Sequence, residues 1–168
     1  EVWLNILKKI PSSKLILKSS TKKENDKFKN FLQKENLDKS VIFLPTAKNF
    51  EDHMNLYKNI DIALDTFPWN GVTTSFEAIW MGIPVITMKG YNFNSRCGES
   101  INKNIQMSEL IAQNKEDYVS KVLDLANDIK KLLNIRNQIF NNALSSPLFD
   151  AQNFSKDFFN LIKKTQTK

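Results

Sequence analysis

One short stretch of this sequence combines residue types that suit an anion site. The stretch NGVTTSFEAIWMGIPVIT begins at Asn70 and places Gly71 before two hydroxyl side chains, Thr73 and Thr74, and the carboxylate of Glu77. A helix that starts at Thr73 exposes unpaired backbone N–H groups and about half a positive charge at its N-terminus. Gly71 has no side chain, so a ligand can approach the backbone closely there. The stretch therefore predicts a phosphate site.

The same residues also fit a purely structural role. Thr74 and Glu77 match the capping box S/T-x-x-E, in which the carboxylate only ties down the start of the helix. Gly82 would then end that helix, and Pro84 would open the next strand. The spacing matches neither the dinucleotide fingerprint nor a P-loop. From the residues alone, both interpretations stay open.

Strands and helices alternate over the first 90 residues. Apolar runs predict strands at 15–17, 41–44, 61–65 and 85–88, and helical spacing predicts helices at 2–10, 22–36, 49–59 and 73–81. This alternation is typical of a parallel sheet, whose strands are apolar throughout because both faces are buried. After Gly90 only helices are predicted, around 94–103, 107–112, 115–127, 128–143 and 151–164.

We therefore expect an α/β fold, a Rossmann-like parallel sheet flanked by helices with a helical C-terminal wrap. Residues 1–168 would form a single domain, with the sheet in 1–90 and the wrap in 91–168. Glu1 begins directly in a helical pattern, without a cap, so we expect the chain to be a fragment of a larger protein.

Composition narrows the classes of partner. The net charge is +6, but only Arg96 and Arg136 are arginines. Side chains that bind a phosphate or a base through two hydrogen bonds are mostly arginine. A nucleic-acid partner is therefore not expected. No apolar run approaches the ~20 residues of a membrane helix, and a lone cysteine, Cys97, fits a reducing cytosol. One histidine and one cysteine cannot build a structural zinc site, so we expect a cytoplasmic protein without a metal.

The stretch DIALDTFPWNGVTTSFEAIWMGIPVITMKG resembles the signature of the protein O-linked N-acetylglucosaminyltransferase family, especially its bacterial members that follow tetratricopeptide repeats. EVWLNILKKIPSSKLIL and SSPLFDAQNFSKDFFNLI also resemble parts of that family, so the likeness covers nearly the whole chain. These enzymes have the GT-B architecture, in which two Rossmann-like lobes hold a sugar nucleotide between them. The resemblance implies that this chain is the C-terminal, donor-binding lobe of an inverting glycosyltransferase.

The resemblance also implies contacts to a UDP-sugar. Thr73 and Thr74 match threonines that bind the diphosphate, after the turn formed by Asn70 and Gly71. Glu77 matches the carboxylate that accepts from the ribose hydroxyls. Val72 stands where the animal enzymes have a histidine, so that phosphate contact is missing, as it is in many bacterial relatives.

The resemblance places the base at the end of the second strand. Ala47 and Lys48 lie where backbone groups hold uracil in the family, and Lys48 resembles a lysine near the uridine. His53 matches a base-contacting histidine, although without the resemblance the favoured interpretation is a helix histidine packed on its neighbours. Arg96 resembles a recurring Ser-Arg after the fourth strand, where a structural role and a ligand role are both open.

The family's catalytic lysine lies upstream of Glu1, and its acceptor site lies in the other lobe, so no catalytic residue is expected in this chain. The implied partners are a UDP-sugar and, through the missing lobe, a protein acceptor whose Ser/Thr hydroxyls receive N-acetylglucosamine or a similar sugar, with no cofactor. A second interpretation is the same fold with GDP-fucose, or an N-linked glucosyltransferase. A third is a non-catalytic interaction module, for which the capping box would suffice.

Overall fold

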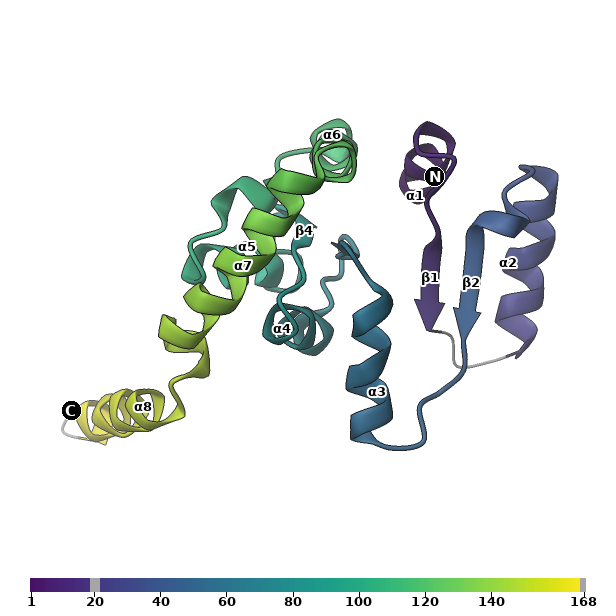
Figure 1. The fold of residues 1–168 in the computed structure, drawn as a ribbon. Helices are drawn as coiled ribbons and strands as arrows, with labels where there is room; N and C mark the ends of the chain where they lie inside the picture. Colours follow the sequence, from purple (N-terminus) through teal and green to yellow (C-terminus); the bar gives the residue numbers. More distant parts are fainter. Residues whose placement is uncertain (19–21, 167–168) are drawn as a thin grey trace.

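The computed structural model describes residues 1–18 and 22–166 (Figure 1). Within them, parallel strands form two sheets. One sheet joins β1 (Leu15–Lys18) to β2 (Val41–Leu44), and the other has the order β3 (Ala63–Leu64), β4 (Val85–Met88), β5 (Ile111–Ala112). The predicted α/β class with parallel strands is confirmed. The strands do not, however, form one continuous sheet.

Helices connect and cover these strands. Their bounds are α1 (Val2–Lys9), α2 (Lys22–Lys34), α3 (Phe50–Leu56), α4 (Val72–Trp80), α5 (Cys97–Asn104), α6 (Lys115–Asn127), α7 (Ile129–Ser145) and α8 (Ala151–Gln166). Short 3-10 turns occupy Asp38–Ser40, Tyr57–Asn59, Phe93–Ser95, Ser108–Leu110 and Pro147–Phe149. Figure 1 shows α8 projecting away from the rest of the chain at its C-terminal end.

The helix predicted around 107–112 is wrong. A 3-10 turn at Ser108–Leu110 leads there into β5, which pairs with β4 through Thr87↔Ile111 and Met88↔Ala112. The segment is short and buried, and periodicity alone cannot separate a short buried strand from a helix. The sheet therefore extends beyond residue 90, into the part expected to be helical throughout.

The main core forms around β4. Ile86 of this strand and Ile79 of α4 are fully buried, as is Ile139 of α7. Residues of α5 and α6 belong to the same cluster of buried side chains. A smaller cluster joins α1, β1, α2 and β2. The larger core thus fixes α4 against the second sheet, and α4 carries the predicted phosphate site.

Gly82 ends α4 in a left-handed conformation. Its φ is +68°, the Gly82 N–H donates to the Ile79 carbonyl at 2.9 Å, and the Ile83 N–H donates to the Ala78 carbonyl at 2.9 Å. A Cβ added to Gly82 would lie 3.5 Å from the Arg136 carbonyl oxygen, which is ordinary contact. The backbone conformation, rather than lack of space, therefore requires glycine here.

Glu99 anchors α5 in a cluster of cations. Its side chain is 4% exposed and accepts hydrogen bonds from Arg96 Nε and Lys103 Nζ, both at 2.8 Å, while Lys89 Nζ lies 3.8 Å away. Hydrogen bonds from Lys103 and Arg96 lower the pKa of Glu99 to about 2. The folded chain therefore favours the ionised carboxylate.

We predict that Gly82→Ala lowers the free energy of unfolding by about 1–2 kcal/mol, because alanine is strained in the left-handed region. Gly82→Asn should cost less, since asparagine visits this region more readily. Urea unfolding of both variants measures the difference. A stabilised Gly82→Ala, the usual result where φ is negative, would contradict the left-handed ending.

A second prediction concerns acid stability. Because the pKa of Glu99 is depressed, its contribution is complete above pH 4.5 and is lost as the pH falls toward 2. Over this range, the free energy of unfolding of the wild type should fall more steeply than that of Glu99→Gln. Urea unfolding at several pH values tests this, with Glu109→Gln, an exposed position, as the matched control. Parallel curves for wild type and Glu99→Gln would show that the cation cluster does not stabilise the carboxylate.

Candidate functional site

Helix α4 begins at Val72, one residue earlier than predicted, and Gly71 is its N-cap without a side-chain capping bond. Thr74 is therefore the third helical residue, and its hydroxyl donates to the Gly71 carbonyl at 2.7 Å. The predicted capping box between Thr74 and Glu77 is wrong, because the turn ends at Gly71 rather than at Thr74. Glu77 therefore does not cap the start of α4, which was the structural alternative to a ligand role.

The start of α4 presents unpaired backbone donors. The Gly71 N–H donates to Asp65 Oδ1 at 2.8 Å, and the Ser75 N–H donates to the Gly71 carbonyl at 2.7 Å. Between them, the N–H groups of residues 72–74 form no hydrogen bond within the described part of the chain. Val72, Thr73 and Thr74 are also exposed. This arrangement can hold an anion such as a phosphate.

A buried carboxylate holds the loop that leads into α4. Asp65 is 5% exposed, and its Oδ2 accepts the Thr87 hydroxyl of β4 at 2.7 Å while Oδ1 accepts the Gly71 N–H. Burial raises the pKa of Asp65 above its ordinary value, and the hydrogen bonds from Gly71 and Thr87 partly oppose this. Sequence reasoning missed this role of Asp65. An aspartate at the end of an apolar strand could have indicated a side chain that holds the following loop.

Packing also favours glycine at position 71. A Cβ at this position would lie 2.5 Å from Thr74 Oγ1, closer than two atoms can approach without movement. Its φ is −88°, which any residue can adopt. Gly71 therefore lets the turn pack against Thr74, in addition to any ligand approach predicted from the sequence.

Glu77 lies at the centre of a polar cluster between α3 and α4. Its Oε2 accepts the Tyr57 hydroxyl at 2.8 Å and lies 2.8 Å from His53 Nε2. Lys18 Nζ lies 3.0 Å from His53 Nδ1. An ammonium has only donors, so Nδ1 accepts, and His53 donates to Glu77 through Nε2. Lys18, His53, Tyr57 and Glu77 are called the Glu77 cluster below.

The Glu77 cluster is only partly buried. The side chains of His53 and Glu77 are 20% and 19% exposed, so both remain accessible to a ligand. Burial and the neighbouring Glu77 carboxylate raise the pKa of Tyr57, which therefore stays a neutral hydrogen-bond donor. Sequence reasoning predicted His53 and Glu77 but missed Lys18 and Tyr57. Tyr57 stands four residues after His53, and this helical spacing could have identified it.

Asn70 joins two loops rather than facing outward. It is 5% exposed, and its Oδ1 accepts the Gly98 N–H at 3.1 Å while its Nδ2 donates to the Thr66 carbonyl at 2.8 Å. The Asn70 N–H also donates to the Asn94 carbonyl at 3.1 Å. These bonds tie the loop after β3 to the loop after β4, so Asn70 has a structural role whether or not it also contacts a ligand.

The remaining predicted residues lie around this centre. Arg96 donates to Glu99 at 2.8 Å, which is a structural role, and its side chain is still 51% exposed. Ala47 and Lys48 follow β2 and directly precede Asn49, the N-cap of α3. Within the described residues, no hydrogen bond joins Ala47 or Lys48 to the Glu77 cluster. The ligand roles predicted for these residues stay predictions.

The residues that the structure describes hold neither a cluster of metal ligands nor a membrane-spanning helix. They contain no group of three or more His, Cys, Asp or Glu side chains placed to hold a metal ion. In the same part of the chain, no helix has the length and apolar character to cross a membrane.

Comparisons with solved structures support the fold. A mutant of the O-GlcNAc transferase of Thermobaculum terrenum superposes with a TM-score of 0.89 at 26% sequence identity, over 97% of this chain and 32% of that one. The likeness therefore concerns about a third of that enzyme's chain.

Sequence comparisons identify the family. A tomato (Solanum lycopersicum) protein named probable UDP-N-acetylglucosamine–peptide N-acetylglucosaminyltransferase SPINDLY is 33% identical over 97% of this chain and 18% of its own length. The corresponding Caenorhabditis elegans transferase is 29% identical over 96% of this chain and 14% of its own length. The profile of glycosyl transferase family 41 matches residues 1–158. This chain, which spans less than a fifth of those relatives, therefore belongs to glycosyl transferase family 41.

Proposed function

We propose that this chain binds the UDP part of a UDP-sugar and forms the donor lobe of an inverting glycosyltransferase. The parent enzyme would transfer N-acetylglucosamine or a similar sugar to Ser/Thr hydroxyls of proteins. One observation carries the proposal: the open N-terminus of α4 and the Glu77 carboxylate lie on the same helix, about one turn apart. The names of the tomato and Caenorhabditis elegans relatives, a probable and an assigned peptide N-acetylglucosaminyltransferase, support the choice of sugar and acceptor.

The spacing on α4 suits a nucleoside diphosphate. Thr73 and Thr74 precede Glu77 by four and three residues, which corresponds to a rise of about 5–6 Å along a helix. In UDP the diphosphate is attached directly to the ribose. We place the diphosphate on the unpaired N–H groups of residues 72–74 and the ribose hydroxyls on the Glu77 carboxylate. His53 and Tyr57 both contact Oε2 of Glu77, so Oε1 is the proposed acceptor for the ribose hydroxyls.

The base would lie beyond the ribose, toward α3. His53 borders Glu77 directly, and Ala47 and Lys48 lie in the loop that leads into α3. We propose that backbone groups of this loop and the His53 ring contact uracil. Contacts of Asn70 and Arg96 with the donor are also part of the proposal, in addition to the structural hydrogen bonds of Asn70 with Gly98 and of Arg96 with Glu99.

The proposed chemistry places little demand on this lobe beyond charge stabilisation. When an acceptor hydroxyl attacks the sugar carbon, the bond to the diphosphate breaks and its electron pair stays on UDP. Fixed N–H donors at the start of α4 would stabilise that charge without reorganisation. The acceptor site and the group that removes the hydroxyl proton would come from the rest of the parent enzyme. No metal takes part in this proposal.

We predict that Glu77→Gln in the full-length protein weakens UDP binding by about tenfold or more. A hydrogen bond to a charged group is worth about 1.5–3 kcal/mol, and each ~1.4 kcal/mol lost is a tenfold change in Kd. The thermal midpoint should change little, because the glutamine oxygen can still accept the Tyr57 hydroxyl. Calorimetric titration with UDP, and with GDP in parallel, measures both effects.

Glu51→Gln is the matched control, because it makes the same change at an exposed position on α3. It should leave UDP affinity unchanged. If Glu77→Gln binds UDP as tightly as the wild type, Glu77 does not bind the ribose hydroxyls. Tighter binding of GDP than UDP would favour the alternative donor, and no binding of either nucleotide by the wild type would favour the interaction module.

A further inference from the structure

The loop that leads from β3 to α4 receives little support from strand pairing. β3 consists of Ala63 and Leu64, which pair with Val85 and Ile86 of β4. After them, the Asp65 N–H donates to the Ile86 carbonyl at 2.9 Å, and the chain turns away from the strand. The position of this loop, and with it the start of α4, therefore depends on side chains from other elements.

Tyr118 of α6 contacts the loop at its first residues. Its hydroxyl donates to the Asp65 backbone carbonyl at 2.9 Å, and its ring packs edge-on against the Phe67 ring, with the ring centroids 5.4 Å apart. The Tyr118 side chain is fully buried. Burial, together with the negative charge of Asp65, raises the pKa of Tyr118, so the hydroxyl keeps its proton and donates it to the carbonyl.

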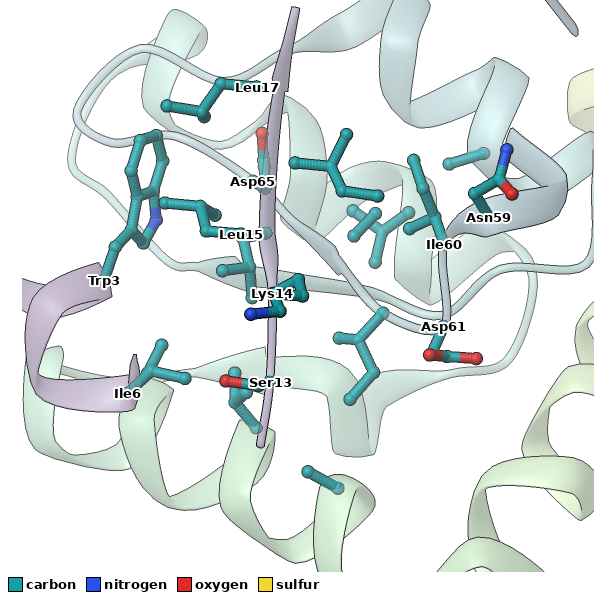
Figure 2. A pocket seen from close by; sticks show the side chains of 18 of the residues that line it. Trp3, Ile6, Ser13, Lys14, Leu15, Leu17, Asn59, Ile60, Asp61 and Asp65 are labelled. Carbon is teal, nitrogen blue, oxygen red and sulfur yellow. The ribbon is translucent and has the colours of Figure 1, made fainter. Parts of the chain in front are cut away.

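Trp3 of α1 holds the Tyr118 hydroxyl from another element. Its side chain forms a hydrogen bond with the Tyr118 oxygen, which partly opposes the rise in the pKa of Tyr118. An indole has a donor and no acceptor, so Trp3 donates, and the Tyr118 proton is left for Asp65. Trp3 and Asp65 both line a cavity of about 550 Å³ between the two sheets (Figure 2). The hydrogen bonds therefore run in one direction, from α1 through α6 to the end of β3.

Asp65 connects these hydrogen bonds to the start of α4. Its backbone carbonyl accepts from Tyr118, while its carboxylate accepts the Gly71 N–H at 2.8 Å and the Thr87 hydroxyl at 2.7 Å. Because the carbonyl and the carboxylate belong to one residue, a shift of the Asp65 backbone also moves the carboxylate. Gly71 is the N-cap of α4, so such a shift changes the direction of the N–H groups of residues 72–74.

We propose that Tyr118 is a positioning residue for the anion site at the start of α4. Its hydroxyl holds the Asp65 backbone, the Asp65 carboxylate holds Gly71, and the N–H groups of residues 72–74 stay directed at the diphosphate. Fixed donors stabilise charge without reorganisation, and a displacement of about 1 Å caused by a distant substitution can lower a rate by about 100-fold. The inference rests on the proposed function, because it concerns the diphosphate part of the same site.

Hydrogen exchange of the full-length protein, without nucleotide, tests the link from Tyr118 to Gly71. Tyr118→Phe removes the hydroxyl and keeps the ring that packs against Phe67. The Gly71 amide should then exchange several-fold faster, up to about tenfold, which is the contribution of one hydrogen bond. Val122→Ala is the control for lost stability, because it removes buried atoms one turn further along α6. It should leave exchange at Gly71 unchanged.

The second measurement compares the affinities of UDP and uridine by calorimetry in the same variants. Uridine lacks the diphosphate, so the ratio of the two dissociation constants reports on the anion site. Tyr118→Phe should lower the preference for UDP by about tenfold, the loss expected when one hydrogen bond to a charged group is weakened. It should leave the affinity for uridine unchanged. Val122→Ala, and Tyr91→Phe at an exposed position, should keep the wild-type ratio.

The outcomes separate positioning from packing. A packing role alone would lower the melting temperature of Tyr118→Phe and Val122→Ala without changing the ratio of UDP to uridine affinity. Unchanged exchange at Gly71 in Tyr118→Phe would overturn the proposal, and so would an unchanged ratio. A wild type that binds UDP no more tightly than uridine would contradict the proposed function itself, and with it the role of Tyr118 in diphosphate binding. Faster exchange at Gly71 would still establish that Tyr118 holds the loop.

Discussion

The hydrogen bonds of the Asp65 carboxylate hold the proposed site together. One oxygen accepts the Gly71 N–H and the other accepts the Thr87 hydroxyl, so a single buried side chain joins the end of β3, the turn before α4 and the middle of β4. The same carboxylate leaves no room for a side chain at position 98, because a Cβ on Gly98 would lie 2.5 Å from Asp65 Oδ2. The start of α4 is therefore fixed before any ligand binds, which is the preorganisation that charge stabilisation requires.

From this fixed point, α4 extends toward α3 and presents Glu77 to His53 and Tyr57. The cluster gives Glu77 two donors in the absence of a ligand, so the carboxylate is oriented rather than free. Donor binding would add hydrogen bonds to a group that is already in place. The resulting arrangement is a row of fixed groups, N–H donors first, then a carboxylate, then a histidine, which matches the order of diphosphate, ribose and base in a nucleotide.

Local sequence patterns were sufficient for much of this fold, since apolar runs and helical spacing predicted β1, β2, β4 and the helices on either side. β5 was missed because two buried residues after a 3-10 turn carry no periodicity of their own. The capping box was wrong because Thr74 and Glu77 have the right spacing, but the N-cap of α4 is Gly71, three residues before Thr74. Tyr57 was within reach of a local pattern, because it stands four residues after His53, whereas Lys18 depends on how β1 packs against α3, a tertiary contact that leaves little trace in a local pattern.

The most direct test of the donor site is the effect of UDP on hydrogen exchange in the full-length protein. The N–H groups of residues 72–74 have no partner in the described chain, so their exchange should be fast in the free protein. The account predicts that UDP slows exchange at residues 72–74, with a smaller effect around Ala47 and His53, and leaves α8 unchanged. Saturable UDP binding that protects other segments while residues 72–74 remain fast would contradict it.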